Sequence, residues 1–130
     1  MHSRRTARTA AFLACLAAVA FPAAAQEGFP LDGTWRGEWG PPGEGHRVVI
    51  VMDWDGERIN GMINPGPESI EFRRAELEPS TWTVRIEAVN HEDQEILIEG
   101  TLQDIGSYNR YIVGTWTQDG AENPFKITRE

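Results

Sequence analysis

The stretch that decides the fold is Gly33-Thr34-Trp35-Arg36-Gly37-Glu38-Trp39, and its first three residues return near the other end of the chain as Gly114-Thr115-Trp116. In an extended chain successive side chains point to opposite faces, so Trp35, Gly37 and Trp39 share one face. Polar and charged side chains occupy the other face. The alternation predicts a strand with one face in a core, and its return predicts a similar strand near the end.

Short runs of the same kind fill the chain between and beyond these two stretches, and Gly, Pro, Asn and Asp separate them. The cleanest alternation lies between Thr81 and Val89. Asp55-Gly56 and Asp119-Gly120 have the composition of two-residue hairpin turns. Eight strands are predicted, at residues 33–39, 46–54, 57–63, 69–77, 81–89, 94–103, 108–117 and 124–129.

Every predicted connection is short, which favours antiparallel pairing of neighbouring strands. An open sheet of this kind leaves two unpaired edges, and closing it into a barrel removes them. We therefore predict an all-β fold, an eight-stranded antiparallel up-and-down barrel, with an open two-sheet sandwich as the alternative. Glycines on the inward face would let the coiled strands bend, at Gly37, Gly61, Gly100 and Gly114.

Residues 1–25 have the pattern of an export signal. Arginines precede an apolar run from Ala10 to Ala20, and Ala23-Ala24-Ala25 supplies the small residues that signal peptidase reads. We expect cleavage before Gln26, a single barrel domain over residues 26–130, and a periplasmic or secreted protein. Ser3-Arg4-Arg5 leaves twin-arginine export open as the route.

The chain has 12 basic and 20 acidic residues, and its formal net charge is −8 at pH 7. Nucleic acids and anionic membranes bind basic faces, so we expect no nucleic-acid partner and no membrane insertion. The single cysteine, Cys15, lies within the export signal. The mature domain must therefore be stable through burial alone, without disulfides.

Gly33-x-Trp35 on the first strand, with Arg129 on the last, resembles the calycin group of lipocalins, fatty-acid-binding proteins and avidins. In lipocalins the tryptophan of this motif stacks against an arginine at the end of the barrel, so the resemblance implies a Trp35–Arg129 contact. It also implies a barrel that holds a small ligand. Trp39-Gly40-Pro41-Pro42 replaces the polar segment with which avidins contact biotin, so biotin binding is not implied.

The candidate ligand-binding residues are those that the pattern places inside the barrel or at its rim. Four tryptophans fall on inward faces, a fifth stands at a strand end, and two arginines share the parity of an inward aromatic residue. They are Trp35, Trp39, Trp54, Trp82, Trp116, Arg74 and Arg110. The alternative is that the indoles fill the core and the arginines reach water from strand ends.

Patterns for catalysis or metal binding are missing from the sequence. Asp53-x-Asp55-Gly56 begins like a calcium loop but lacks the closing glutamate, and His46 and His91 have no second ligand nearby. No serine lies in a nucleophile elbow. We expect no metal, no cofactor and no enzymatic activity.

Two functions remain. One is an exported barrel that binds a small apolar or aromatic ligand in its interior. The alternative is a protein-interaction or inhibitor module that acts through its outer surface or loops. An internal cavity above about 300 Å³ would favour the first, and an interior packed solid would favour the second. The outward side chains of Leu97, Tyr111 and Val113 also predict a possible homodimer, as avidin-like barrels associate through their late strands.

Overall fold

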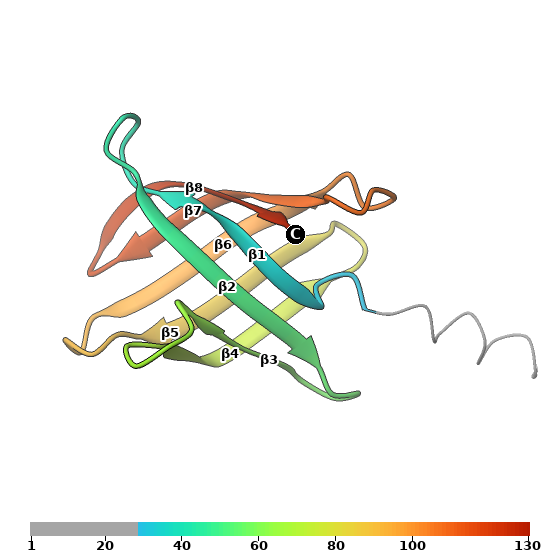
Figure 1. Ribbon diagram of the computed structural model, residues 1–130, viewed down its shortest axis with the longest axis horizontal. Helices are drawn as coiled ribbons and strands as arrows, with labels where there is room; N and C mark the ends of the chain where they lie inside the picture. Colours follow the sequence, from blue (N-terminus) through green and yellow to red (C-terminus); the bar gives the residue numbers. More distant parts are fainter. Residues whose placement is uncertain (1–28) are drawn as a thin grey trace, which may run out of the picture.

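The computed structural model describes residues 29–130, so the predicted export signal and its cleavage site lie outside the described residues. Eight antiparallel strands form a closed barrel in sequence order (Figure 1). They are β1 (Gly33–Trp39), β2 (His46–Trp54), β3 (Ile59–Ile63), β4 (Ile70–Glu78), β5 (Thr83–Val89), β6 (Glu95–Gln103), β7 (Tyr111–Gln118) and β8 (Ala121–Arg129). The barrel closes where β1 pairs with β8 as well as with β2. The predicted up-and-down barrel is confirmed, and the sandwich alternative is wrong.

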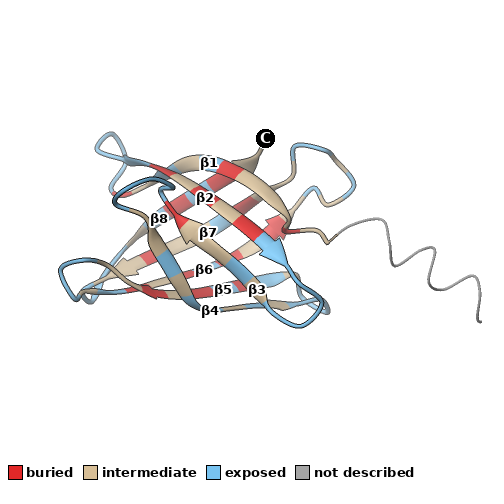
Figure 2. Cartoon of the chain, turned by 60° about the horizontal axis from the view of Figure 1, so that its bottom comes forward, coloured by how far each residue is buried: buried red, intermediate tan, exposed pale blue. Residues whose placement is uncertain are grey.

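Apolar side chains fill the barrel interior, and buried positions alternate with exposed ones along most strands (Figure 2). The fully buried set is Leu31, Trp35, Val48, Ile50, Met52, Ile63, Val84, Ile86, Ala88, Ile96, Ile98, Leu102, Ile112, Trp116, Phe125 and Ile127. Among residues 29–130 no polar or charged residue is buried. Burial of apolar surface is therefore the main stabilising contribution in this domain.

A β-bulge interrupts the alternation in β4. Phe72 pairs with Ala88, but the next partners are Arg74 with Glu87 and Ala75 with Ile86. The extra residue reverses the parity of the strand, so Ala75 faces inward and Arg74 faces out. The expectation that Arg74 shares the inward face of Phe72 is therefore wrong: Arg74 is exposed and forms an ion pair with Glu76.

The two predicted Asp-Gly turns differ. Asp119 and Gly120 both have positive φ, 52° and 83°, and they join Gln118 to Ala121 as a two-residue hairpin turn. Between β2 and β3 the closing pair is Trp54 with Ile59, so the turn has four residues, 55–58, and the two-residue prediction is wrong there. The Asp55 carboxylate explains the longer turn. It accepts backbone N–H groups from Glu57 and Arg58 at 2.9 and 2.8 Å.

These hydrogen bonds predict a pH-dependent stability. The backbone N–H of Arg58, then that of Glu57 and the side chain of Asn60, hold the pKa of Asp55 below its ordinary value. The stabilisation is therefore present above the unfolded-state pKa and is lost as the pH falls through the folded-state pKa. We expect Asp55→Ala to lower the thermal midpoint at neutral pH, and the difference from wild type to shrink in acid.

Thermal melts at neutral and acidic pH, followed by circular dichroism, measure this difference. Asp55→Asn is the matched control, because it keeps an acceptor oxygen but cannot ionise. Its difference from wild type should be smaller than that of Asp55→Ala at neutral pH. A loss for Asp55→Ala that is equally large at both pH values would contradict the role of the carboxylate charge.

Residues 29–32, the lead-in before β1, close the end of the barrel near Trp35. The Trp35 indole N–H donates to the Leu31 carbonyl oxygen at 2.9 Å, and Leu31 is 0% exposed. Arg129 is the cross-strand partner of Trp35, but its Nε donates to the Asp32 carbonyl oxygen at 2.7 Å. Its guanidinium carbon lies 5.1 Å from the ring centroid of Tyr108. The cation–π partner of Arg129 is thus Tyr108, and the Trp35 stack implied by the lipocalin resemblance is wrong.

The outward apolar residues of β6 and β7 form two separate groups. Leu97 pairs with Thr117, whereas Val113 pairs with Thr101, four positions along the same ladder. Glu99 lies between them on β6 and forms an ion pair with Arg85 on β5 at 2.8 Å. The homodimer through Leu97, Tyr111 and Val113 stays a prediction, and its two halves would have a charged pair between them.

Candidate ligand-binding pocket

The barrel wall is weakest between β3 and β4. These strands pair only at Met62 with Glu71 and at Ile63 with Ile70. Beyond this point β3 stays paired with β2 as far as Ile59, and β4 continues along β5 through its bulge. Of the eight strands, β4 alone has no fully buried residue, which Figure 2 shows as a strand of intermediate and exposed colours. The core is therefore thin along β4.

An open pocket of about 560 Å³ lies at this gap, and we call it the β3–β4 pocket. Its apolar lining combines inward side chains with aromatic residues from the end of the barrel: Phe29, Trp54, Ile59, Phe72, Ala75, Leu77 and Pro79. Its polar lining is Glu57, Arg58, Asn60, Arg73, Arg74 and Glu76. The volume lies within the range of small-molecule sites, but the lining is more polar than theirs, which is mostly apolar with a few polar groups.

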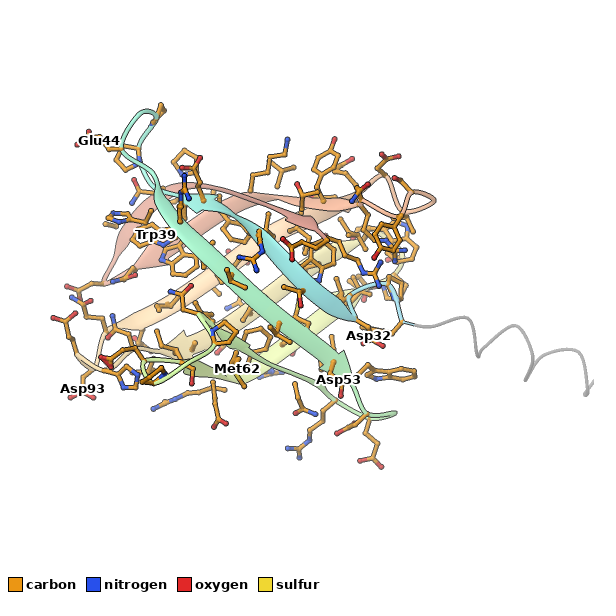
Figure 3. The ribbon with its side chains drawn as sticks, in the orientation of Figure 1. Asp32, Trp39, Glu44, Asp53, Met62 and Asp93 are labelled. Carbon is orange, nitrogen blue, oxygen red and sulfur yellow. The ribbon has the colours of Figure 1, made fainter. Side chains whose placement is uncertain are left out.

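Two aromatic rings form one wall of the pocket. Phe29 and Trp54 stack with their ring centroids 4.9 Å apart. The backbone N–H of Trp54 donates to a carboxylate oxygen of Asp32 at 2.9 Å, which ties the lead-in to the end of β2. Figure 3 labels Asp32 and Asp53 side by side at this end of the barrel. The Trp54 side chain remains 43% exposed, so a ligand could stack against it.

The structure separates the residues that the sequence grouped as one site. Trp54 and Arg74 line the β3–β4 pocket, Arg74 from the outer side of the bulge. Trp35 and Trp116 are buried in the core, and Trp82 is half-buried against it. These three tryptophans therefore fill the interior, as the alternative interpretation stated.

Trp39 and Arg110 also lie away from this pocket. Trp39 is half-buried between the rings of His46 and Trp116, at centroid distances of 4.5 and 4.7 Å. Arg110 is half-buried near the lead-in, where Nη1 donates to the Pro30 carbonyl oxygen at 3.0 Å and Nε to that of Ser107 at 3.2 Å. Arg110 thus holds the lead-in segment in place.

Sequence reasoning missed the other charged residues of the pocket. Arg73 lies in the predicted strand 69–77 and Arg58 in the predicted strand 57–63, and neither was among the candidate ligand-binding residues. The signal that could have revealed them is the pair Arg73-Arg74, which breaks the alternation of its strand and so marks a bulge. Phe29 precedes the first predicted strand, and no pattern marked it as a candidate ligand contact.

A second hollow, of about 590 Å³, lies on the outer surface beneath the β1–β2 loop. Figure 1 shows this loop projecting beyond the barrel. Its lining includes Pro41, Pro42 and Pro124 together with the cationic side chains of Arg36 and Lys126. Prolines fix φ and present a rigid surface, and this hollow lies on the outer face of the barrel.

Residues 29–130 contain no group of three or more His, Cys, Asp or Glu side chains that could hold a metal ion. Over the same range there is no helix with the length and apolarity needed to cross a membrane. No family model, no curated protein and no solved structure matches the chain. Any functional conclusion therefore depends on the geometry of the site.

Proposed function

We propose that the protein is an exported, calycin-like barrel that binds a small apolar or aromatic molecule without catalysis, and that the ligand occupies the β3–β4 pocket. The pocket carries this proposal. It gives outside access to side chains that belong to the inward faces of β3 and β4. The buried side chains fill the centre of the barrel, where the sequence predicted the ligand. We therefore place the ligand in the barrel wall instead.

The binding energy would come from burial of the ligand against Phe72, Leu77 and the Trp54 ring. Apolar burial contributes about 25 cal/mol per Å², so a compact ligand at an open site would bind with micromolar affinity. The turn beside the pocket has only four residues, 55–58. A turn of this length is too short to act as a lid over a long lipid chain.

Phenylnaphthylamine, a neutral aromatic fluorophore, tests the proposal on purified residues 26–130. We expect its emission to rise with micromolar affinity and tryptophan emission to fall. Ala75→Phe should block the pocket and weaken binding about tenfold or more, because the new ring occupies ligand space. Trp39→Phe, in the other hollow, should leave the affinity unchanged.

The thermal midpoint of each variant confirms that it is folded. Absence of probe binding to the wild type would contradict the proposal. So would equal affinities for wild type and folded Ala75→Phe.

A protein-interaction module is the second candidate. The filled barrel interior favours it, as does the hollow beneath the β1–β2 loop. If probe binding is lost in Trp39→Phe and retained in Ala75→Phe, the hollow beneath the β1–β2 loop is the binding surface instead of the β3–β4 pocket.

A further inference from the structure

The arginines of residues 29–130 differ in how their charges are satisfied. Arg36, Arg74 and Arg85 form ion pairs with glutamates. The guanidinium groups of Arg110 and Arg129 donate to backbone carbonyl oxygens. Within the described chain, Arg47, Arg58 and Arg73 have no carboxylate within ion-pair distance. Two of these three, Arg58 and Arg73, line the β3–β4 pocket.

The lining side chains of the pocket have a net charge of +1, although the protein is acidic. Its lining carries Arg58, Arg73 and Arg74 against Glu57 and Glu76, whereas the whole chain has a net charge of −8. The Arg74–Glu76 ion pair removes one charge of each sign from this balance. Glu57 is then the remaining anionic side chain of the lining. Asp55 lies in the same turn, and the positive charge of Arg58 contributes to lowering the pKa of Asp55.

Both free guanidinium groups belong to positions that the backbone holds in place. The N–H of Arg58 donates to the Asp55 carboxylate at 2.8 Å, which fixes the turn from which its side chain extends. Arg73 is the extra residue of the β4 bulge, a feature that often redirects a side chain beside a binding site. Arg58 directly precedes β3 and Arg73 belongs to β4, so the two residues come from the two strands that flank the gap.

We infer that the ligand of the β3–β4 pocket is amphipathic, with an apolar or aromatic body and one oxyanion group such as a carboxylate. This inference rests on the proposed function. The body contacts Phe72 and Leu77, and the oxyanion lies at the rim between Arg58 and Arg73. Guanidinium groups bind oxyanions through two parallel hydrogen bonds, a geometry that suits this rim. The net negative charge of the chain repels anions, and the arginines of this rim oppose that repulsion locally.

A matched pair of fluorophores tests the inference. Anilinonaphthalene sulfonate carries the same two aromatic units as phenylnaphthylamine, with one added oxyanion. At low ionic strength we expect the sulfonate to bind about fivefold more tightly than the neutral compound, as expected for charge pairing at a partly exposed rim. Added salt should reduce this ratio.

The double variant Arg58→Gln, Arg73→Gln should abolish the preference for the sulfonate, so that the affinities for the two compounds become equal. Both side chains are exposed, so the fold should tolerate the change, and the thermal midpoint verifies this. The matched control is Arg47→Gln, Lys126→Gln, which removes the same charge from exposed positions outside the pocket. It should keep the preference.

The outcomes separate the two proposals. Binding of the neutral compound without any preference for the sulfonate overturns the inference and leaves the proposed function intact. An equal loss of preference in both double variants also overturns it, because the cause would then be the overall charge. If neither compound binds, the proposed function itself fails.

Discussion

Replacing Trp35 with alanine is expected to lower the free energy of unfolding by about 4 kcal/mol, within the range for deleting a buried aromatic side chain. Trp35 is 0% exposed and lies between Ile50 on β2 and Arg129 on β8, where the barrel closes. Its indole N–H also donates to the Leu31 carbonyl oxygen, so the variant would lose the bond that holds the lead-in over this end. The change thus combines a cavity with a lost hydrogen bond.

Equilibrium unfolding in urea measures this loss. Trp54→Ala is the matched control, because it deletes the same side chain from a position that is 43% exposed. Its cost should be about 1 kcal/mol or less, as for other partly exposed residues. Similar losses for both variants would contradict the assignment of Trp35 to the core. A domain of this size is typically stable by only about 5–15 kcal/mol, so Trp35→Ala should unfold at much lower urea concentration.

Gly114→Ala should have the second largest effect, a loss of about 3 kcal/mol, as for overpacking against a rigid surface. Gly114 is the cross-strand partner of Gly100, and a Cβ atom there would overlap the Glu99 carbonyl oxygen and the Gly100 Cα. These are backbone atoms, and they cannot rotate away. The β6 and β7 strands would have to separate and weaken the hydrogen bonds between them.

Gly106→Ala is the control for this prediction. Gly106 lies in the loop between β6 and β7, and a Cβ atom there meets nothing within 4 Å. The two substitutions add the same methyl group, so most of the difference in their unfolding free energies should come from the steric overlap at Gly114. Equal stability of the two variants would show that β6 and β7 separate without cost.

Only part of the candidate site could be predicted from the sequence. Trp54 was placed at a strand end near the rim, and it lines the β3–β4 pocket. Arg74 also lines it, although the expected inward orientation was wrong. Arg58, Arg73 and Phe29 were not recognised as a group, because no local pattern shows that β3 and β4 separate after two pairs.

The barrel itself follows from local regularities. Side-chain alternation has a period of two and depends only on the extended backbone, so the eight strands could be predicted from patterns such as that of Gly33–Trp39. Their inward faces followed from the same pattern, except in β4 beyond its bulge. The Asp119-Gly120 turn was equally predictable, since both residues adopt positive φ at low cost. Short turns between neighbouring strands then restrict the topology to a meander.

The pocket depends on interactions between segments that are distant in sequence. The bulge at Arg73 exists because β4 keeps its pairing with β5, and this pairing shifts Ala75 and Leu77 to the inward face. The partner of Arg129 is Tyr108 because the loop before β7 reaches the end of the barrel, and lead-in atoms compete for the same guanidinium group. The alternation of side chains with a period of two does not show where a bulge forms or which residue Arg129 contacts, because these contacts form only when the strands pair.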